Sequence, residues 1–185
     1  MTQVTQHTPR KILVTGCASG IGLAQTQLFL DGGDQVYGVD KQKPQAIDDP
    51  NFSFFQVDLV GDLTALLAQL PQNFDVICHT AGGGGAAYTT SKHALAGFTK
   101  QLALDYARTR VQIFGIAPGA VQTGMTRQDF EADNGQMADW VASETPVGRW
   151  AQPSEVAELT AFLASGKASY MQGEIVKIDG GWTLK

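Results

Sequence analysis

The stretch Val14-Thr15-Gly16-Cys17-Ala18-Ser19-Gly20-Ile21-Gly22 decides the fold of this chain. An apolar run at 11–14 leads into three glycines, and apolar positions at helical spacing follow at 23–30. This order predicts a strand, a glycine turn and a helix. Such a turn presents backbone N–H groups at a helix N-terminus, where the helix dipole favours an anion. Glycine is needed there because a Cβ would block the close approach of a pyrophosphate. The stretch therefore predicts a dinucleotide site, with a ligand-free glycine turn as the alternative.

A second predicted strand, 35–40, ends in the carboxylate of Asp40. Asp40 follows the glycine turn by about 20 residues, where an acidic residue accepts hydrogen bonds from the adenosine ribose. A carboxylate at this place would repel the 2′-phosphate of NADP(H), so NAD(H) is the favoured cofactor. The nearby Lys41 and Lys43 keep NADP(H) as the alternative. The other reading of Asp40 is a solvated residue at a strand end.

Composition and charge narrow the class of protein. The 185 residues suit one domain with a substantial core, and 43% hydrophobic with 17% charged residues is ordinary for a globular protein. The net charge of −5 argues against nucleic acid or an anionic membrane as a partner. No apolar run approaches the ~18 residues of a membrane span, and the first ten residues lack the apolar core of a signal peptide, so we expect a cytoplasmic protein.

Two residue types that often mark metal sites give no such signal here. Cys17 and Cys78 have no ligand-like neighbours, so we expect free thiols in a reducing compartment. The three histidines show no metal-ligand spacing, and no metal is expected.

Strand and helix patterns alternate along the chain, which predicts an α/β fold: a Rossmann-type, doubly wound parallel sheet with helices on both faces. The near-continuous apolar runs 76–78 and 113–116 predict strands buried on both faces. We expect residues 1–185 to form a single dinucleotide-binding and catalytic domain, with 1–9 flexible. The predicted strands are 11–15, 35–40, 52–58, 74–80, 111–117 and 175–179, and the predicted helices are 21–31, 63–70, 88–107, parts of 125–143, and 154–164.

Tyr88 and Lys92 stand four residues apart in a predicted helix, which places them on one face. The reference pKa of a tyrosine is about 10, too high for acid–base work at neutral pH, and a nearby ammonium lowers it by favouring the phenolate. The pair could therefore exchange a proton with a carbonyl or alcohol oxygen. The alternative is a chance pair on a solvated helix face.

Taken together, these motifs resemble the short-chain dehydrogenase/reductase family, and most of all its 3-oxoacyl-carrier-protein reductase branch. The resemblance covers nearly all of 11–182 and implies NAD(P)-dependent transfer of hydride between the nicotinamide and a carbonyl or alcohol carbon of a small molecule, by a dimer or tetramer. The segments that carry it are 15–22, Asp40, Asp58, 80–82, 88–92, Pro118-Gly119 with Thr123, 146–149, Pro153, 155–157, 162–165, and 173 through 179–181.

The resemblance also implies a role for individual residues. Tyr88 would be the acid/base, and Lys92 would hold the nicotinamide ribose and lower the pKa of the tyrosine. For Pro118-Gly119 an ordinary turn is the alternative, and for Asp58 a helix cap. The residues implied to contact the cofactor are Gly16, Ser19, Gly20, Ile21 and Gly22 at the pyrophosphate, Asp40 at the adenosine ribose, Asp58 and Leu59 at the adenine, Ala81 and Gly82 beside the fourth strand, Tyr88, Lys92, and Pro118, Gly119, Val121 and Thr123 at the nicotinamide amide.

The chain departs from the family between Gly82 and Tyr88, which are only six positions apart. The family has a long helix and a further strand there, roughly 50 residues, the size of one crossover with its loops. That segment carries the family's catalytic serine and an asparagine that supports a proton relay, and neither has a counterpart here. Ser91, inside the tyrosine–lysine motif, is not a substitute. Either the printed sequence omits a segment of the polypeptide, or the deletion is real and exposes apolar surface on the helix that contains Tyr88.

Several functions remain open on the sequence. One alternative is an NAD-linked dihydrodiol dehydrogenase of the 2,3-dihydro-2,3-dihydroxybenzoate type. Others are a protein that binds the cofactor but is catalytically impaired for want of the serine, and a dinucleotide sensor. Residues 124–145 are expected to cover the substrate, and the apolar side chains that they contribute are Met125, Phe130, Met137 and Trp140.

Overall fold

A computed structural model describes residues 8–45, 47–59, 62–79 and 85–184, the side chains of 85–89 and 91 excepted. The chain divides into two compact units, Met1–Thr80 and Ala81–Lys185. Each unit is described by itself, so the prediction of a single domain stays a prediction.

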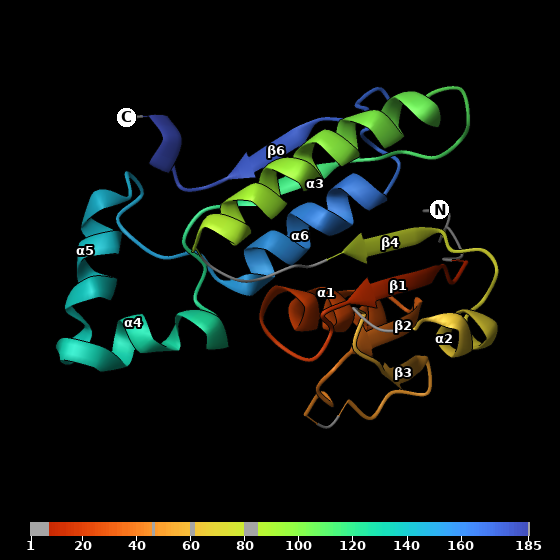
Figure 1. The fold of residues 1–185 in the computed structure, drawn as a ribbon, viewed down its shortest axis with the longest axis horizontal. Coiled ribbons are helices and arrows are strands. Elements are labelled where there is room, and N and C mark those ends of the chain that lie inside the picture. The colour runs from red at the N-terminus through yellow and green to blue at the C-terminus, as the bar shows by residue number, and fades with distance from the viewer. Residues whose placement is uncertain (1–7, 46, 60–61, 80–84, 185) are drawn as a thin grey trace, which may run out of the picture. The chain divides into compact units, whose positions relative to one another are not determined.

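The first unit is a parallel sheet in the order β3-β2-β1-β4 (Figure 1). Right-handed crossovers between parallel strands place its two helices on opposite faces. The core lies along β1 and β2, where Ile12, Val14 and Val36 have no exposed surface. The elements are β1 (Lys11–Thr15), α1 (Gly20–Asp31), β2 (Gln35–Asp40), β3 (Phe52–Gln56), α2 (Thr64–Gln69) and β4 (Val76–His79).

A buried ion pair joins the beginnings of β1 and β2. The carboxylate of Asp34 is almost fully buried and accepts hydrogen bonds from the backbone N–H, Nε and Nη2 of Arg10, at 3.0, 3.2 and 2.6 Å. A buried charge is tolerated only when it is paired and hydrogen-bonded in this way.

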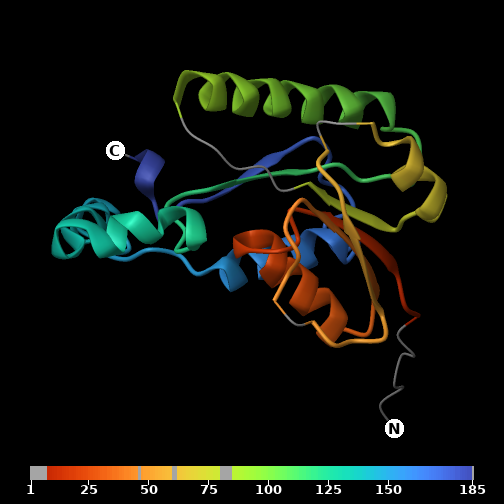
Figure 2. The ribbon, with the colours of Figure 1, turned by 60° about the horizontal axis from the view of Figure 1, so that its bottom comes forward.

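The second unit contains the parallel pair β5 (Gly115–Pro118) and β6 (Ile175–Ile178). Helix α3 (Gly85–Asp105) covers one face of this pair and α6 (Pro153–Ala164) covers the other (Figure 2). The remaining elements follow the carboxyl ends of the two strands: η1 (Gly124–Thr126), α4 (Arg127–Glu131), η2 (Ala132–Gly135) and α5 (Gln136–Glu144) after β5, and η3 (Trp182–Leu184) after β6.

Each predicted strand and helix has a counterpart in the described structure, but the bounds of some differ. The predicted strand 111–117 is shorter than expected, because β5 begins only at Gly115. In the segment before it, the side-chain amide of Gln172 accepts from the N–H of Ile113 at 2.9 Å and donates to the carbonyl of Val111 at 3.1 Å. The side chain of Gln172 thus makes hydrogen bonds to the backbone of this segment that a neighbouring strand would otherwise make.

The prediction that both runs 76–78 and 113–116 are buried on both faces is wrong. In β4 the side chain of Cys78 is buried, but 63% of the surface of Ile77 is exposed. In the second run, 113–116 is half-buried throughout. Successive side chains of a strand point to opposite faces, so within the first unit the face of β4 that carries Cys78 is covered and the face that carries Ile77 is not.

Helix α3 carries the exposed apolar surface that the short interval after Gly82 predicts. Phe98 and Leu104 are 58% and 72% exposed. None of the described helices is both long and apolar enough to cross a membrane. The described Cys17 and Cys78 are both free thiols, as expected.

Candidate functional site

The glycine turn connects β1 to α1 in an unusually tight path. Gly16 and Gly20 have φ values of 74° and 54°, in the left-handed region that favours glycine. At Gly22 a Cβ would lie 2.0 Å from the carbonyl oxygen of Gly16, so any side chain there would collide with the backbone of the turn. Ser19 occupies the N-cap of α1 but makes no side-chain capping bond. The turn is therefore closed on itself and leaves backbone N–H groups at the helix N-terminus for an anion.

The Gly22 contact makes a direct prediction. We expect Gly22→Ala to weaken dinucleotide binding at least about tenfold and to cost on the order of 1–3 kcal/mol of stability, since overpacking forces a backbone shift. Thermal unfolding and NADH titration would measure both. The matched control is Gly97→Ala in α3, where a Cβ meets nothing within 4 Å and should stabilise the helix. Unchanged affinity in Gly22→Ala would show that the turn does not hold the cofactor.

Asp40, at the end of β2, reaches back to the glycine turn. One carboxylate oxygen accepts from the backbone N–H of Ala18 at 3.0 Å, and the other accepts from the N–H of Gln42 at 3.0 Å. Each oxygen keeps a further lone pair that could accept from a ribose hydroxyl. The structure thus brings Asp40 and the turn Gly16–Gly22 together within one unit, although they are far apart in the sequence.

Cys17 is buried inside the turn and is chemically inert there. Burial and the charge of Asp40 raise the pKa of its thiol to about 12. Its Sγ packs against the backbone of Gly38 in β2, where a Cβ would lie 2.7 Å away. Burial also raises the pKa of Cys78 to about 12. A neutral thiol is a poor nucleophile, so neither cysteine is a catalytic candidate.

A hydrogen bond that the sequence does not predict joins the ends of β1 and β4. The hydroxyl of Thr15 lies 2.9 Å from Nδ1 of His79. Because the register pairs Thr15 with His79 across parallel strands, both residues stand at the edge of the sheet where the glycine turn begins. The position of a β-sheet partner cannot be read from one sequence, which is why this pair was missed.

Four further residues are predicted to contact the cofactor, and the structure describes only two of them, Asp58 and Leu59. Asp58 and Leu59 follow β3 and are exposed, in the same unit as the glycine turn. The N-cap position of α2 is Leu63 and not Asp58, and the preceding Asp62 accepts from the N–H and hydroxyl of Thr64 at 2.9 and 2.6 Å. Ala81 and Gly82 lie outside the described residues.

Tyr88 and Lys92 lie on α3 in the second unit, one helical turn apart, as the spacing predicts. The side chain of Tyr88 lies outside the described part, whereas Lys92 is half-buried. Burial lowers the pKa of the Lys92 ammonium, because a desolvated charge is less stable. A cation on the same helix face remains suited to stabilising a phenolate.

The predicted nicotinamide contacts lie at the carboxyl end of β5. The N–H of Gly119 donates to the carbonyl of Ile178 at 3.0 Å, and a Cβ on Gly119 would lie 2.8 Å from Cα of Asp179. Pro118 ends β5, and Thr123 forms a reciprocal capping box with Thr126. The side chain of Val121 is buried, so only its backbone could contact a ligand. The structure therefore places Pro118, Gly119, Val121 and Thr123 together, beside the end of β6.

A cavity of about 210 Å³ opens at this same edge, lined by Gly119, Ala120, Ile178, Asp179, Gly180 and the ion pair of Arg149 with Glu155, among others. The guanidinium of Arg149 donates two bonds of 2.8 Å to the two carboxylate oxygens of Glu155. This bidentate pair holds the pKa of Glu155 down at about 2. Arg149 and Glu155 thus neutralise each other beside the cavity, whereas the carboxylate of Asp179 accepts from Gly181 and Thr183.

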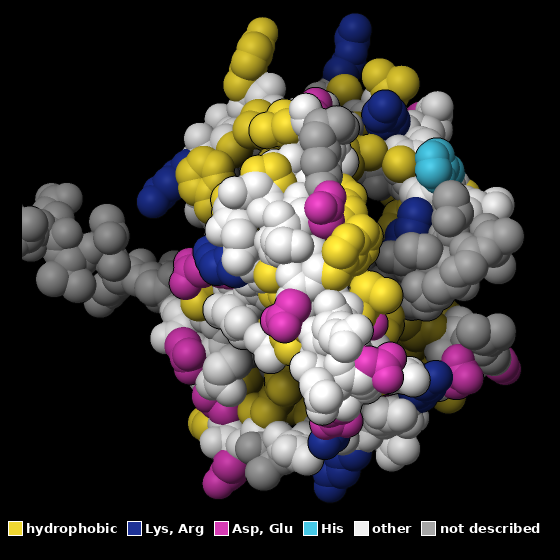
Figure 3. All heavy atoms as spheres, turned by 90° about the vertical axis from the view of Figure 1, so that its left-hand side faces the viewer, with side chains coloured by type: hydrophobic (Ala, Val, Ile, Leu, Met, Phe, Trp, Pro, Cys, Tyr) yellow, Lys and Arg dark blue, Asp and Glu magenta, His cyan; other side chains and the backbone are white. Residues whose placement is uncertain are grey.

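The segment 124–145, expected to cover the substrate, is a pair of short helices anchored to the loop before α6. The indole Nε1 of Trp150 donates to the carbonyl of Ala138 at 2.9 Å, and its ring packs on Phe130 at 4.9 Å between centroids. Phe130 therefore has a structural role, whereas Met125, Met137 and Trp140 are exposed. Figure 3 shows hydrophobic side chains beside acidic ones on the face that carries α4 and α5.

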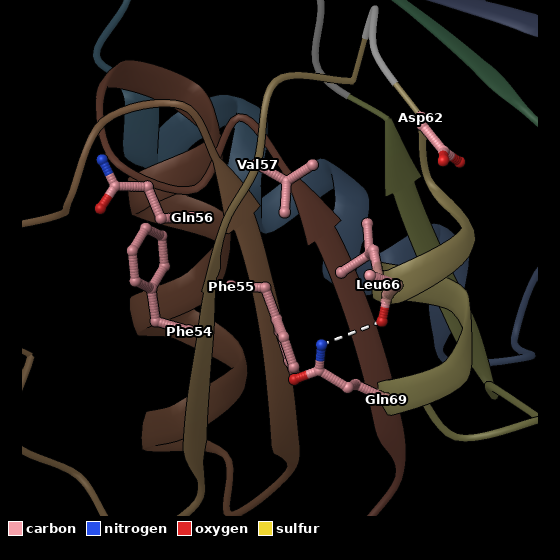
Figure 4. A pocket seen from close by; sticks show the side chains of 8 residues that line it. Phe54, Phe55, Gln56, Val57, Asp62, Leu66 and Gln69 are labelled. Atoms are coloured by element: carbon pink, nitrogen blue, oxygen red, sulfur yellow. Dashed lines mark hydrogen bonds between the residues drawn. The ribbon is translucent and has the colours of Figure 1, made fainter.

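Another cavity, of about 280 Å³, lies between β3 and α2 (Figure 4). Phe55, Val57 and Leu66 point into it, and the amide of Gln69 donates to the carbonyl of Ala65 at 2.9 Å beside it. No residue predicted to contact cofactor or substrate lines this cavity. Among the described residues, no group of His, Cys, Asp and Glu is arranged to hold a metal ion.

Comparison with known proteins supports a common origin for this arrangement. Residues 73–183 match the model of the short-chain dehydrogenase family described as enoyl-(acyl carrier protein) reductase. The chain is 40% identical over 101 residues to gluconate 5-dehydrogenase of Gluconobacter oxydans, which covers 55% of this chain and 39% of that protein. The matched stretches span only 37–39% of the lengths of this and two further curated relatives.

A solved structure shows the fold of the whole chain. The short-chain dehydrogenase family protein of Francisella tularensis is 27% identical, with a TM-score of 0.86 over 96% of this chain and 100% of its own. The Rossmann-type α/β fold predicted from the sequence, with parallel strands and helices on both faces, is therefore confirmed.

A longer alignment with a relative includes gaps on the side of this chain. The short-chain type dehydrogenase/reductase y4vI of Sinorhizobium fredii is 28% identical over 239 residues, which use 94% of this chain and 43% of the relative. Since 239 exceeds the 185 residues of the chain, the alignment must contain gaps on its side. The relative therefore has residues that have no counterpart in this chain.

Proposed function

Because this chain belongs to the short-chain dehydrogenase/reductase family, we propose that it is an NAD(H)-linked oxidoreductase that acts on a carbonyl or alcohol carbon of a small molecule. Two features of the glycine turn carry the proposal. There is no room for a Cβ at Gly22 against the carbonyl oxygen of Gly16, and the backbone N–H of Ala18 donates to the carboxylate of Asp40. A cradle that a single Cβ would fill, with a carboxylate held at its rim, suits a pyrophosphate and an adenosine ribose.

Within this proposal each group on the chain has a defined task. The turn Gly16–Gly22 would bind the pyrophosphate through backbone N–H groups, and Asp40 would accept from the ribose hydroxyls. When bound, the nicotinamide supplies or accepts the hydride. Tyr88 would give a proton to the substrate oxygen during reduction and take it back during oxidation. Lys92 would hold a ribose and keep the tyrosine pKa low enough for this exchange.

The proposal is tested by binding and turnover on one preparation. NADH and NADPH are titrated by fluorescence, and the protein is then assayed with both cofactors against a panel of ketones, alcohols, hydroxy acids and acyl thioesters. We expect submillimolar NADH binding and hydride transfer to at least one class. Absence of binding to either dinucleotide would contradict the proposal outright.

The cofactor preference depends on Asp40. We expect Asp40→Ala to weaken NADH binding about tenfold, the effect of losing a hydrogen bond to a charged group, while NADPH binding improves relative to NADH because the repulsion of the 2′-phosphate is gone. Titration of both cofactors against both proteins measures the ratio. Asp48→Ala, an exposed carboxylate of the same unit, is the control. A natural preference for NADPH would show that the argument from Asp40 is wrong.

For the substrate, the resemblance to 3-oxoacyl-carrier-protein reductases leads us to propose a 3-oxoacyl group or a related ketone. The matched family model is described as enoyl-(acyl carrier protein) reductase, which supports an acyl chain as the substrate but names the reduction of a C=C bond and not of a 3-oxo group. The relative named gluconate 5-dehydrogenase supports a sugar acid instead. The dihydrodiol alternative, a cyclic diol acid, is tested by the same panel.

A cofactor-binding protein with impaired catalysis is the second candidate, and a specific observation favours it. Only six positions separate Gly82 from Tyr88 in the sequence, where the family resemblance implies a further helix and strand with the catalytic serine. Tight NADH binding with negligible turnover on every substrate class would identify this candidate.

A further inference from the structure

One face of α5 is apolar and turned to solvent. Met137 and Trp140 are three residues apart and share this face, and they are 52% and 54% exposed. The ring of Trp140 meets the ring of Trp182 edge to face, with centroids 6.3 Å apart and planes at 80°. Aromatic pairs of this geometry are attractive beyond their burial, so the two rings form one platform. Met137, Trp140 and Trp182 are called the Trp platform below.

The Trp platform is formed by segments that follow the carboxyl ends of two parallel strands, and none of its three residues lines the cavity of about 210 Å³. Trp140 belongs to the segment that follows β5, and Trp182 to the segment that follows β6. Parallel strands end at a common edge, and ligands of open α/β sheets bind outside the carboxyl ends of the strands. The cavity of about 210 Å³ opens at this edge, with Gly119 and Asp179 in its lining.

The segment 124–145, which contributes Met137 and Trp140 to the Trp platform, is acidic. Residues 124–145 carry the carboxylates Asp129, Glu131, Asp133, Asp139 and Glu144, against the single guanidinium of Arg127.

The segment 118–152, which the structure describes completely, contains two cationic side chains, and both are engaged by carboxylates. Arg127 pairs with Glu131, and Arg149 pairs in bidentate fashion with Glu155. Recognition of a carboxylate substrate needs a cation whose donors are available to it. With five carboxylates against these two guanidinium groups, the net charge of the segment repels an anion.

We propose that the substrate of this protein is an uncharged, apolar carbonyl or alcohol compound whose ring or chain packs on the Trp platform, and that the acidic segment 124–145 disfavours substrates with a carboxylate. The proposal rests on the proposed function for the hydride chemistry and specifies its substrate. The proposal distinguishes between the substrate classes considered above. Hydroxy acids and the dihydrodiol acid carry a carboxylate, whereas an acyl chain or an alicyclic ketone does not.

The test compares two ligands that differ only in charge. β-Tetralone and the same ketone carrying a carboxylate on its aromatic ring are titrated into the protein saturated with NAD⁺, and binding is followed by calorimetry and tryptophan fluorescence. We expect the neutral ketone to bind at least about tenfold more tightly at low salt, and the difference to shrink in high salt as the acidic segment is screened.

Two variants locate the effect. Trp140→Ala should weaken β-tetralone binding about fivefold or more, because it removes an aromatic surface, whereas Tyr170→Ala, which removes a fully exposed aromatic ring, should not change it. Asp139→Asn should narrow the preference for the neutral ketone without weakening its binding. Circular dichroism confirms that each variant is folded.

The outcomes separate this proposal from the proposed function. Neutral binding that depends on Trp140, with no hydride transfer from NADH, supports the Trp platform and contradicts the proposed function. Equal or tighter binding of the carboxylate, or no binding of either ketone, overturns the substrate proposal. Turnover of gluconate with β-tetralone inert upholds the oxidoreductase and overturns the apolar substrate.

Discussion

Replacing Tyr88 with phenylalanine should lower kcat by at least ~10²-fold, the effect of losing a general acid/base, with the Kd for NADH unchanged within about twofold. The ring and its packing are retained, and only the transferable proton is lost. Steady-state kinetics on the best substrate of the panel and NADH titration measure the two quantities separately. Single-turnover rates confirm that the chemical step is the one affected.

The companion variant Lys92→Ala distinguishes the roles of the pair. Lys92 is half-buried on α3 and is expected to serve both the cofactor ribose and the tyrosine, so its loss should reduce kcat and weaken NADH binding together. His93→Ala, on an exposed position of the same helix, is a control for the disturbance of α3. Full turnover in Tyr88→Phe would mean that the chain does not use the mechanism of its family.

The second large effect is expected from the short connection between Gly82 and Tyr88. Loss of one preorganised hydrogen-bonding group at the reacting oxygen costs on the order of 3 kcal/mol of barrier, or ~10²-fold in rate. Loss of the strand that carries it would also displace Tyr88, and a misplacement of about 1 Å costs about as much again. A chain of 19.7 kDa should therefore bind NADH yet turn over below about 0.1 s⁻¹, against an ordinary ~10 s⁻¹.

Intact mass and turnover, measured on one preparation, test this expectation. A mass several kilodaltons above 19.7 kDa would show that the polypeptide contains the segment, and ordinary activity is then expected. Insertion of a relative's helix and strand between Gly82 and Tyr88 should raise kcat of the short chain at least ~10²-fold. Ordinary turnover at 19.7 kDa would show that another group replaces the serine.

Local patterns in the sequence determined the elements and the kind of site. The glycine spacing at Gly16, Gly20 and Gly22 predicts the turn because steric exclusion of a Cβ is a local property, and in the structure a Cβ at Gly22 would lie 2.0 Å from the carbonyl oxygen of Gly16. The alternation of strand and helix predicts the α/β fold, since periodicity depends only on neighbours along the chain. The position of Asp40 at the end of a strand follows for the same reason.

Tertiary structure alone decided which distant groups meet. The bond from Ala18 to Asp40, the pairing of Thr15 with His79 and the replacement of a strand by Gln172 each depend on register between segments remote in sequence. The same holds for the segment 124–145, where the sequence predicts the same role for Phe130 and Trp140, as apolar side chains that cover the substrate. Phe130 packs against Trp150 and is half-buried, whereas Trp140 stays exposed beside Trp182, because burial depends on the partners that folding brings together and not on the residue type alone.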